Sequence, residues 1–290
     1  MGKIWAGAIV IVATSFYCLR GSTAQLGAGT EDVVKILADA SSASGQWPNA
    51  TNTGVPTDVK LIPSSGDLIV TEAGTVISGL DIQGSVYING PNVKLMNSRV
   101  TSSGFAVVKI APITGTVIQD CEINGTGGTY DGNSGNQGIE GHGTFVRNNI
   151  YGVENGILIE GDGSVIQDNY IHELLAKGSP HYDGLQIDGG VSNTTIRHNT
   201  IINSHDSTSA IMIDNQLGPV SNVVVDNNLL VGGAFTVYSD AKFNGNPITG
   251  VSFTNNHLGR GQYGFRLFRG NSPTYTGNVN DGARLVQTLN

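Results

Sequence analysis

The sequence predicts an all-β protein, a single-stranded right-handed parallel β-helix in which short strands stack coil upon coil, with a short capping helix at its N-terminal end. One observation is a motif of a β-branched or aromatic residue, a polar pair, Asn and an apolar residue, which recurs at spacings of 20 to 30 residues. Repeats of this length bury their apolar faces only against neighbouring repeats. A second is composition, since 41 Gly, 13% charged and 7% aromatic residues are typical of short strands and tight turns. The motif occurs six times: TFVRNNIY from Thr144, SVIQDNYI from Ser164, TTIRHNTI from Thr194, VVVDNNLL from Val223, VSFTNNHL from Val251 and TYTGNVN from Thr274.

The N-terminal segment has the pattern of a secretory signal. Lys3 precedes an apolar run, and small residues before Gln25 form a cleavage site, so residues 1–24 are predicted to be removed on export to the extracellular space. The mature chain would keep only Cys121, which excludes a disulfide framework. Thr30 is a candidate N-cap for a helix that covers the open end of the solenoid. We therefore expect a helix and an extended lead-in over residues 25–56, and the β-helix over 57–290.

The shared asparagine predicts a buried ladder, because stacked Asn side chains hydrogen-bond along the axis of a repeat structure. In the earlier coils the equivalent residues are Leu80, Ser98 and Cys121, so the ladder is expected to begin only at the fourth coil, and Cys121 is expected to be a buried structural thiol. The aligned motif places the rungs at Asn149, Asn169, Asn199, Asn228, Asn256 and Asn278.

A second strand follows each motif and predicts one exposed surface. Side chains alternate between the two faces of a strand, and neighbouring coils lie about 4.8 Å apart. Alternation sends Phe235 inward, and it groups these pairs on the outward face: Leu158 and Glu160, Gln186 and Asp188, Met212 and Asp214, Thr236 and Tyr238, Arg266 and Phe268. Longer loops at 125–136, 174–182 and 240–249 are expected to wall a groove along this face.

Charge points to an anionic ligand. The net charge of −8 argues against nucleic acid, whereas four basic residues gather near the last coils: Lys242, Arg260, Arg266 and Arg269. A polyuronate fits this combination. Cleavage by β-elimination needs a group that neutralises the sugar carboxylate, a base for the neighbouring carbon-bound proton, and an acid for the leaving oxygen.

The outward face supplies candidates for each role. Arg266 is the expected carboxylate neutraliser, Lys242 the base and Tyr238 the proton-transfer group, with His181 or Tyr182 opposite them. Further residues are expected to bind the sugar: Asp183, Gln186, Asp188, Arg260 and Arg269.

A column of carboxylates offers other chemistry on the same face. Glu160, Asp188 and Asp214 occupy equivalent positions on three coils, and oxygen ligands of this kind favour Ca²⁺. No cofactor is required by the elimination, so calcium stays an option and solvated acids are the simpler reading. Asp188 and Asp214 also allow a glycoside hydrolase, which needs two opposed carboxylates.

Three stretches carry a resemblance to a known family: WPNATNTGVP from Trp47, HYDGLQIDGG from His181 followed by SNTTIRHNTI, and NNLLVGGAFTVYSD running into NNHLGRGQYG. They resemble secreted β-helix proteins of the pectate-lyase-like superfamily, most of all polysaccharide lyase family 31, which includes alginate and glucuronan lyases. The resemblance implies an eliminating enzyme that uses Tyr and Lys as acid and base. Lys242 or Lys177, with Tyr238 or Tyr182, are the positions here that match those roles.

The sequence therefore predicts a secreted, monomeric polyuronate lyase, with alginate the first choice of substrate and glucuronan the second. Its partner is an acidic polysaccharide, and neither nucleic acid nor, once the signal is removed, a membrane is expected. Besides the glycoside hydrolase, two alternatives stay open at this point. A uronate carbon-five epimerase removes the same proton, and a non-catalytic carbohydrate-binding solenoid would use the same surface without chemistry.

Overall fold

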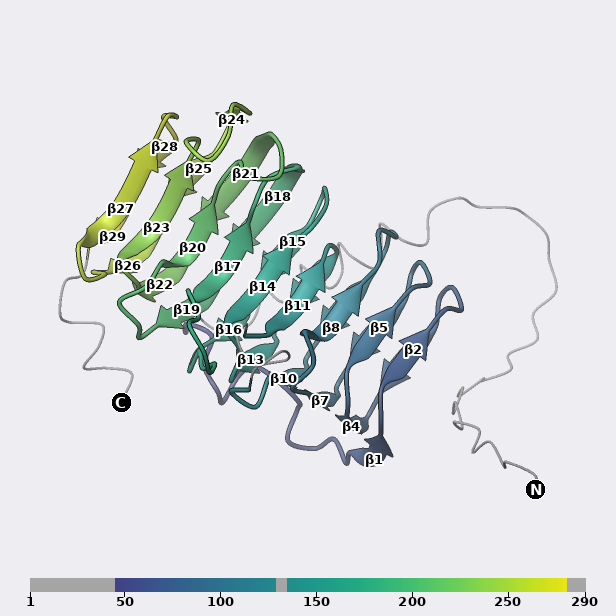
Figure 1. Cartoon of the computed structure of the whole chain (residues 1–290). Coiled ribbons are helices and arrows are strands. Elements are labelled where there is room, and N and C mark those ends of the chain that lie inside the picture. The colour runs from purple at the N-terminus through teal and green to yellow at the C-terminus, as the bar shows by residue number, and fades with distance from the viewer. Residues whose placement is uncertain (1–44, 129–134, 281–290) are drawn as a thin grey trace, which may run out of the picture.

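The computed structural model describes residues 45–128 and 135–280, and these fold into one solenoid of three parallel sheets (Figure 1). The described residues form strands, turns and bends, and none of them lies in a helix. The predicted signal segment and capping helix lie outside the described residues. None of the described residues belongs to a helix long and apolar enough to cross a membrane.

Each coil contributes one strand to each sheet, and the strands of successive coils pair in parallel; an isolated antiparallel bridge joins Ser209 to Gly233. Sheet A contains β1 (Ile62–Ser65), β4 (Leu80–Gln83), β7 (Arg99–Thr101), β10 (Glu122–Asn124), β13 (Asn149–Tyr151), β16 (Tyr170–Ile171), β19 (Thr200–Asn203), β22 (Leu229–Gly232), β26 (His257–Gly259) and β29 (Val279–Asn280). Sheet B contains β2 (Leu68–Val70), β5 (Val86–Ile88), β8 (Ala106–Ile110), β11 (Gln137–Gly141), β14 (Asn155–Ile159), β17 (Asp183–Ile187), β20 (Ser209–Ile213), β23 (Phe235–Asp240) and β27 (Gly264–Arg269). Sheet C contains β3 (Val76–Ser78), β6 (Lys94–Met96), β9 (Val117–Gln119), β12 (Thr144–Val146), β15 (Val165–Gln167), β18 (Val191–Arg197), β21 (Val220–Asp226), β25 (Ser252–Thr254) and β28 (Thr274–Thr276), and β24 (Ile248–Thr249) pairs with β21.

The core is a continuous column of Val, Ile and Leu side chains between the three sheets. Phe145 and Phe253 are its largest fully buried residues. Cys121 is a free, fully buried thiol, and burial raises its pKa to about 12, so it is protonated and unreactive in the core, as expected.

The asparagine ladder runs through this core, but its first rung differs from the predicted one. The side chain of Asn148, and not that of Asn149, bonds the next rung, with its Nδ2 2.9 Å from Asn169 Oδ1. Thr144 pairs with Val165 rather than with Ser164, which shifts the first motif by one residue. Asn149 instead lies on sheet A, where its side-chain oxygen contacts His172 Nε2 at 2.8 Å. The other rungs are confirmed, and the position before Asn148 is Cys121, whose N–H donates to Asn148 Oδ1.

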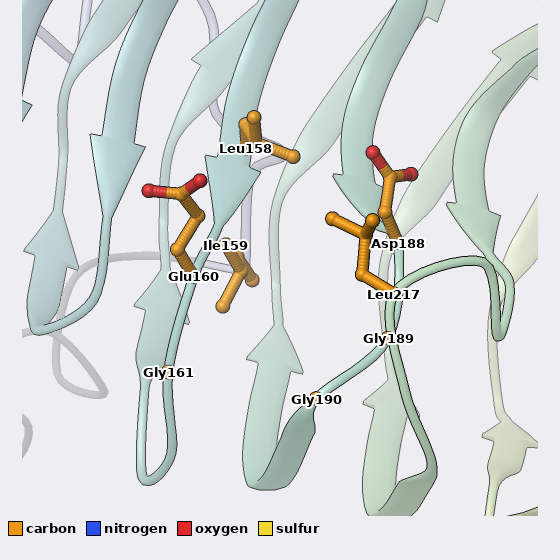
Figure 2. Close-up of a pocket in the computed structure, with 8 residues that line it drawn as sticks. All are labelled: Leu158, Ile159, Glu160, Gly161, Asp188, Gly189, Gly190 and Leu217. Atoms are coloured by element: carbon orange, nitrogen blue, oxygen red, sulfur yellow. The ribbon is translucent and has the colours of Figure 1, made fainter. Parts of the chain in front are cut away.

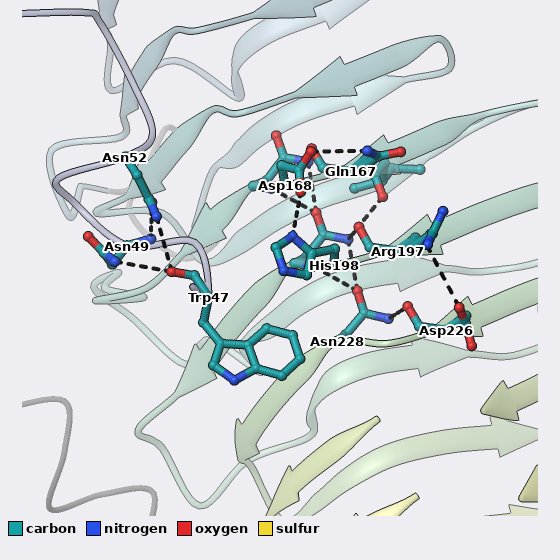
Figure 3. A network of polar contacts seen from close by, with 12 residues as sticks. Trp47, Asn49, Asn52, Gln167, Asp168, Arg197, His198, Asp226 and Asn228 are labelled. Carbon is teal, nitrogen blue, oxygen red and sulfur yellow. Dashed lines mark hydrogen bonds and ion pairs between the residues drawn. The ribbon is translucent and has the colours of Figure 1, made fainter. Parts of the chain in front are cut away.

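The lead-in lies along the outside of the solenoid. The Trp47 ring stacks on His198 with 5.3 Å between ring centroids (Figure 3). It also meets His257 edge-on, again with 5.3 Å between ring centroids. Further along, the N–H of Gly54 donates to the carbonyl of Arg147 at 2.8 Å. The segment therefore runs back over several coils before the chain enters β1.

Sheet B departs from simple alternation at the start of its strands, where two successive residues face the core. Gly184 and Leu185 both point inward, since a Cβ on Gly184 would overlap the Ile201 side chain of sheet A. Thr236 is likewise fully buried beside Val237 and donates to the Gly259 carbonyl. Thr236 is therefore not outward as predicted. Phe235, predicted inward, is half-exposed and lies against the ring of Tyr238.

This close approach of two sheets explains why Gly138, Gly156 and Gly184 succeed one another at this position. We expect Gly184→Ala to lower the free energy of unfolding by about 1–3 kcal/mol, because its methyl would also come within 2.6 Å of the Ala210 carbonyl oxygen. Urea denaturation measures the change. Gly245→Ala is the control, because a Cβ there meets nothing within 4 Å. Equal midpoints for the two variants would contradict the packing argument.

Candidate functional site

The outer face of sheet B, the side turned away from the core, carries three rows of side chains that run along the solenoid axis. Strand register defines them, since each residue of β17 lies beside its partner on β14 and β20. The first row is Asn155, Asp183, Ser209 and Phe235; the second is Leu158, Gln186, Met212 and Tyr238; the third is Glu160, Asp188, Asp214 and Asp240.

His181 stands at the start of these rows, just before β17. Its Nδ1 lies 2.7 Å from Glu154 Oε1, and its Nε2 lies 3.6 Å from Asp183 Oδ2. The side chain is 50% exposed, so one edge of the imidazole is open to a ligand. The hydrogen bond from His181 to Glu154 raises the pKa of His181 to about 9, and the ring is therefore positively charged at neutral pH.

Glu154 and Asn155 hold His181 from the preceding coil. Burial acts to raise the pKa of Glu154, but the hydrogen bonds from His181 outweigh it, so the net shift is downward and Glu154 is ionised. Its second oxygen accepts the N–H of Gly135 at 2.7 Å. Asn155 donates to Gln186 Oε1 at 3.0 Å and lies 3.4 Å from His181 Nε2. The sequence interpretation missed both Glu154 and Asn155.

Asp183 is fully buried beneath His181. Its Oδ1 accepts the Ser209 hydroxyl at 2.6 Å, while Oδ2 has no hydrogen-bond partner in the described residues. Burial raises the pKa of Asp183 to about 7, although Ser209 and the positive charge of His181 act in the opposite direction. The carboxyl group is thus poised between its neutral and ionised forms near neutral pH.

This pKa predicts how stability depends on pH. A folded-state pKa above the ordinary 3.8 means that the native protein holds a proton that the unfolded chain has lost, so the free energy of unfolding falls as pH rises from about 4 to about 7. We expect Asp183→Asn to remove that decline. As pH rises, the free energy of unfolding of the variant should therefore increase relative to that of wild type, by a few kcal/mol at most. Urea denaturation at pH 5 and pH 8 measures the difference. A difference between the two proteins that stays constant with pH would contradict it.

Four other predicted residues lie near His181 on this face. The amide of Gln186 donates to Asp188 Oδ1 at 2.8 Å. Burial raises the pKa of Asp188, and the charge of His181 lowers it, so the two groups interact. Burial also raises the pKa of Tyr238, and the negative charge of Asp183 adds to that shift, which places the phenol within electrostatic reach of Asp183. His181, Gln186, Asp188 and Tyr238 therefore share one surface, and Asp183 is buried directly beneath it.

The structure does not bring Lys242 or Arg266 to His181. Lys242 follows the end of β23, two coils beyond β17, whereas His181 precedes the start of β17, so the two residues differ both in coil and in the edge of the sheet on which they lie. Arg266 pairs with Val237 of the core column, so it faces the open end of the solenoid and not the outer face. Its guanidinium lies over the Tyr275 ring, 4.1 Å from the centroid. Two successive residues face the core at the start of the sheet B strands. The residues that follow, Arg266 among them, therefore point to the opposite side from the one that strict alternation predicts.

The same shift turns Phe268 inward, against the core residue Phe253, with 5.4 Å between ring centroids. Tyr182 is buried and stacks on His205 at 3.6 Å, and its hydroxyl bonds the backbone of Ala176. It therefore faces away from the outer face of sheet B. The loops at 174–182 and 240–249 lie at opposite edges of the sheet and do not wall one groove.

The remaining basic residues have different surroundings. Arg269 lies on the outer face and pairs with buried Asp240, through Nε at 2.7 Å. Arg260 precedes β27, and its guanidinium donates to backbone carbonyls, among them that of Gln262 at 2.9 Å. Lys177 lies in the loop before His181.

The predicted carboxylate column is confirmed in register and extends to Asp240, which pairs with Asp214. Burial raises the pKa of Asp214 to about 6, and the neighbouring charges of Asp188 and Asp240 add to the shift. Glu160 bonds Lys109 at 3.1 Å. Across the described ranges, no three His, Cys, Asp or Glu side chains form a group that could hold a metal ion, so the calcium option has no observation behind it.

A pocket with a volume of about 280 Å³ opens beside this column (Figure 2). Glu160 and Asp188 stand on neighbouring coils, and Leu158 and Leu217 form apolar walls. Ile159 and three glycines, Gly161, Gly189 and Gly190, complete the lining, and the glycines leave the space open because they have no side chains. The outer face thus joins a cationic imidazole, several carboxyl groups and a hollow along one edge.

The match to a family model agrees with the fold. The model of the family described as "Right handed beta helix region" matches residues 137–286. No curated protein matches the chain. A similar solved structure is an alginate lyase from Paenibacillus sp. str. FPU-7, with 13% identity, a TM-score of 0.35, and coverage of 76% of this chain and 84% of that chain. A likeness at this level carries no argument about activity. The matched family region covers more than half of the chain, and its strands are those of the solenoid described above, so this chain belongs to the right-handed β-helix family.

Proposed function

We propose that this protein cleaves a polyuronate by β-elimination on the outer face of sheet B, with alginate the first choice of substrate and glucuronan the second. The observation that carries the proposal is His181, a half-exposed imidazole that Glu154 keeps positively charged on a face that also carries a row of carboxyl groups. A fixed cation that is open to solvent binds a carboxylate and stabilises the charge that develops on it. His181 thereby takes the role that the sequence assigned to Arg266.

The other steps use neighbours of His181. Asp188 accepts the proton from carbon five, since burial makes its carboxylate more basic than an exposed one. The electrons of that C–H bond form the double bond between carbons four and five, and the glycosidic C–O bond breaks. Tyr238 donates its proton to the leaving oxygen, because its raised pKa keeps the phenol protonated at neutral pH. Lys242 has no part in this arrangement.

Hydrolysis is the second candidate, and the carboxylate column favours it. Asp188 and Asp214 lie on adjacent coils, whose strands are about 4.8 Å apart, and retaining glycosidases place their two carboxyl groups roughly 5 Å apart. Asp214, with a pKa of about 6, is partly protonated near neutral pH, as a general acid must be.

One panel of substrates distinguishes these reactions. The purified protein is incubated with alginate, glucuronan, polygalacturonate and a neutral glucan, with and without a chelator. Ultraviolet absorbance with new reducing ends identifies elimination, and reducing ends without absorbance identify hydrolysis. Inverted carbon-five stereochemistry with an intact chain identifies an epimerase, and binding without any change identifies a binding protein. Each of the last three outcomes would overturn the proposal.

A further inference from the structure

A second cation lies along the same edge of sheet B as His181. Arg260 is exposed, and its guanidinium donates only to carbonyl oxygens of its own turn, those of Gly261, Gln262 and Tyr263. No acidic side chain among the described residues forms an ion pair with it. The turn therefore presents a positioned positive charge that none of the acidic side chains in residues 45–128 and 135–280 neutralises by an ion pair.

Aromatic rings stand beside this charge. Tyr263 is 64% exposed, and its ring centroid lies 6.0 Å from that of Phe235. Phe235 in turn meets Tyr238 edge-on at 5.7 Å. Because Phe235 supports Tyr263 from below, the exposed ring is held in place and offers an apolar face next to a cation. A pyranose ring that carries a carboxylate has these two surfaces, an apolar face of C–H groups and a negative charge.

A series of hydrogen bonds between successive coils connects this turn to His181. The Thr208 hydroxyl donates to the carbonyls of His181 and Tyr182, the N–H of Ala234 donates to Thr208 at 2.9 Å, and the N–H of Tyr263 donates to Ala234 at 2.8 Å. Each contact advances by one coil, so His181 and Tyr263 are about 14 Å apart along the axis. That distance corresponds to several sugar units of an extended chain.

We propose that Arg260 and Tyr263 form a distal subsite for an acidic sugar, and that the polysaccharide lies along the solenoid axis between this subsite and His181. The proposal rests on the proposed function for the class of ligand, and it adds the direction of the chain and a second anchoring point. A chain that reaches both cations binds more tightly than one that reaches only His181, because the second contact adds no further loss of translational freedom.

The length dependence of binding tests the subsite. Calorimetry gives the affinities of wild type, Tyr263→Ala and Arg260→Gln for uronate oligosaccharides from disaccharide to hexasaccharide. We expect wild-type affinity to rise with length, and Tyr263→Ala to bind the hexasaccharide about 3- to 10-fold more weakly. Arg260→Gln is expected to lose a similar factor and to show less dependence on salt. Tyr87→Ala, on the outer face of sheet B far from the site, and Arg197→Gln, on sheet C, are the matched controls.

The outcome separates this inference from the proposed function. Tyr263-dependent binding without any ultraviolet-absorbing product would support the subsite and overturn the elimination. A second outcome is that the protein forms the ultraviolet-absorbing product but that affinity rises equally with oligosaccharide length in Tyr263→Ala and Tyr87→Ala. This outcome would overturn the subsite and leave the elimination standing. A wild-type protein that binds no acidic oligosaccharide would overturn both.

Discussion

Replacing His181 with Gln is expected to reduce kcat/KM on a cleaved polyuronate by about 10²–10³-fold, the usual cost of removing one positioned group that stabilises developing charge. Glutamine keeps a hydrogen-bond donor near Glu154 but carries no charge, so the substrate carboxylate loses its counter-ion. Initial rates from ultraviolet absorbance measure the loss. The structure predicts that kcat falls more than KM rises, since the charge on the carboxylate grows as the proton leaves carbon five.

The control for this variant is His142→Gln. His142 also lies at sheet B, where its Nδ1 contacts the Glu160 carbonyl at 3.1 Å, but it stands two coils before His181 and at the other end of the strands. Its replacement should leave kcat/KM near the wild-type value. A wild-type rate for folded His181→Gln, with its circular dichroism unchanged, would remove His181 from the proposed mechanism.

Replacing Asn199 with Ala is expected to lower the free energy of unfolding by about 3–5 kcal/mol. The fully buried side chain accepts from the N–H and the side chain of Asn169, and it donates to the carbonyl of Ile166 at 2.9 Å. Alanine leaves these polar groups without partners in a site that water cannot enter, and it also opens a cavity. Urea denaturation followed by circular dichroism measures the change.

The last rung supplies the comparison. Asn278 accepts from Asn256 in the same way, at 2.9 Å, but it is only partly buried. Water can therefore satisfy the groups that Asn278→Ala exposes, and we expect a loss well below that of Asn199→Ala. Equal losses for the two variants would mean that burial of the ladder is not what makes it stabilising.

The coil architecture could be predicted because every repeat has its own pattern of apolar residues and its own turn residues between strands. The register could be predicted only to within one residue where the sequence offers two adjacent asparagines. Asn148 and Asn149 fit the motif equally well, and the hydrogen bond between Asn148 and Asn169 decides between them. Ser98 and Cys121 were placed correctly, since each takes part in the hydrogen bonds that continue the ladder into the earlier coils.

The candidate site was predicted in part, for a physical reason that concerns the corner between sheets A and B. Strict alternation assumes a straight strand, but Gly184 and Leu185 both face inward there, and the same shift carries Arg266 onto the core column. The succession of Gly138, Gly156 and Gly184 was the available signal. Glu154 could not be linked to His181 from sequence, because its contact spans 27 residues and depends on how the coils stack.

The lead-in has a consequence for how the protein comes apart. The Trp47 ring packs against His198 and His257, and the N–H of Gly54 donates to Arg147, so the lead-in contacts several coils that are distant in sequence. A solenoid without such a segment can unfold one coil at a time from its C-terminal end. Here the coils between Arg147 and His257 cannot separate until the Trp47 indole leaves its two histidines, which favours unfolding of these coils in a single cooperative step.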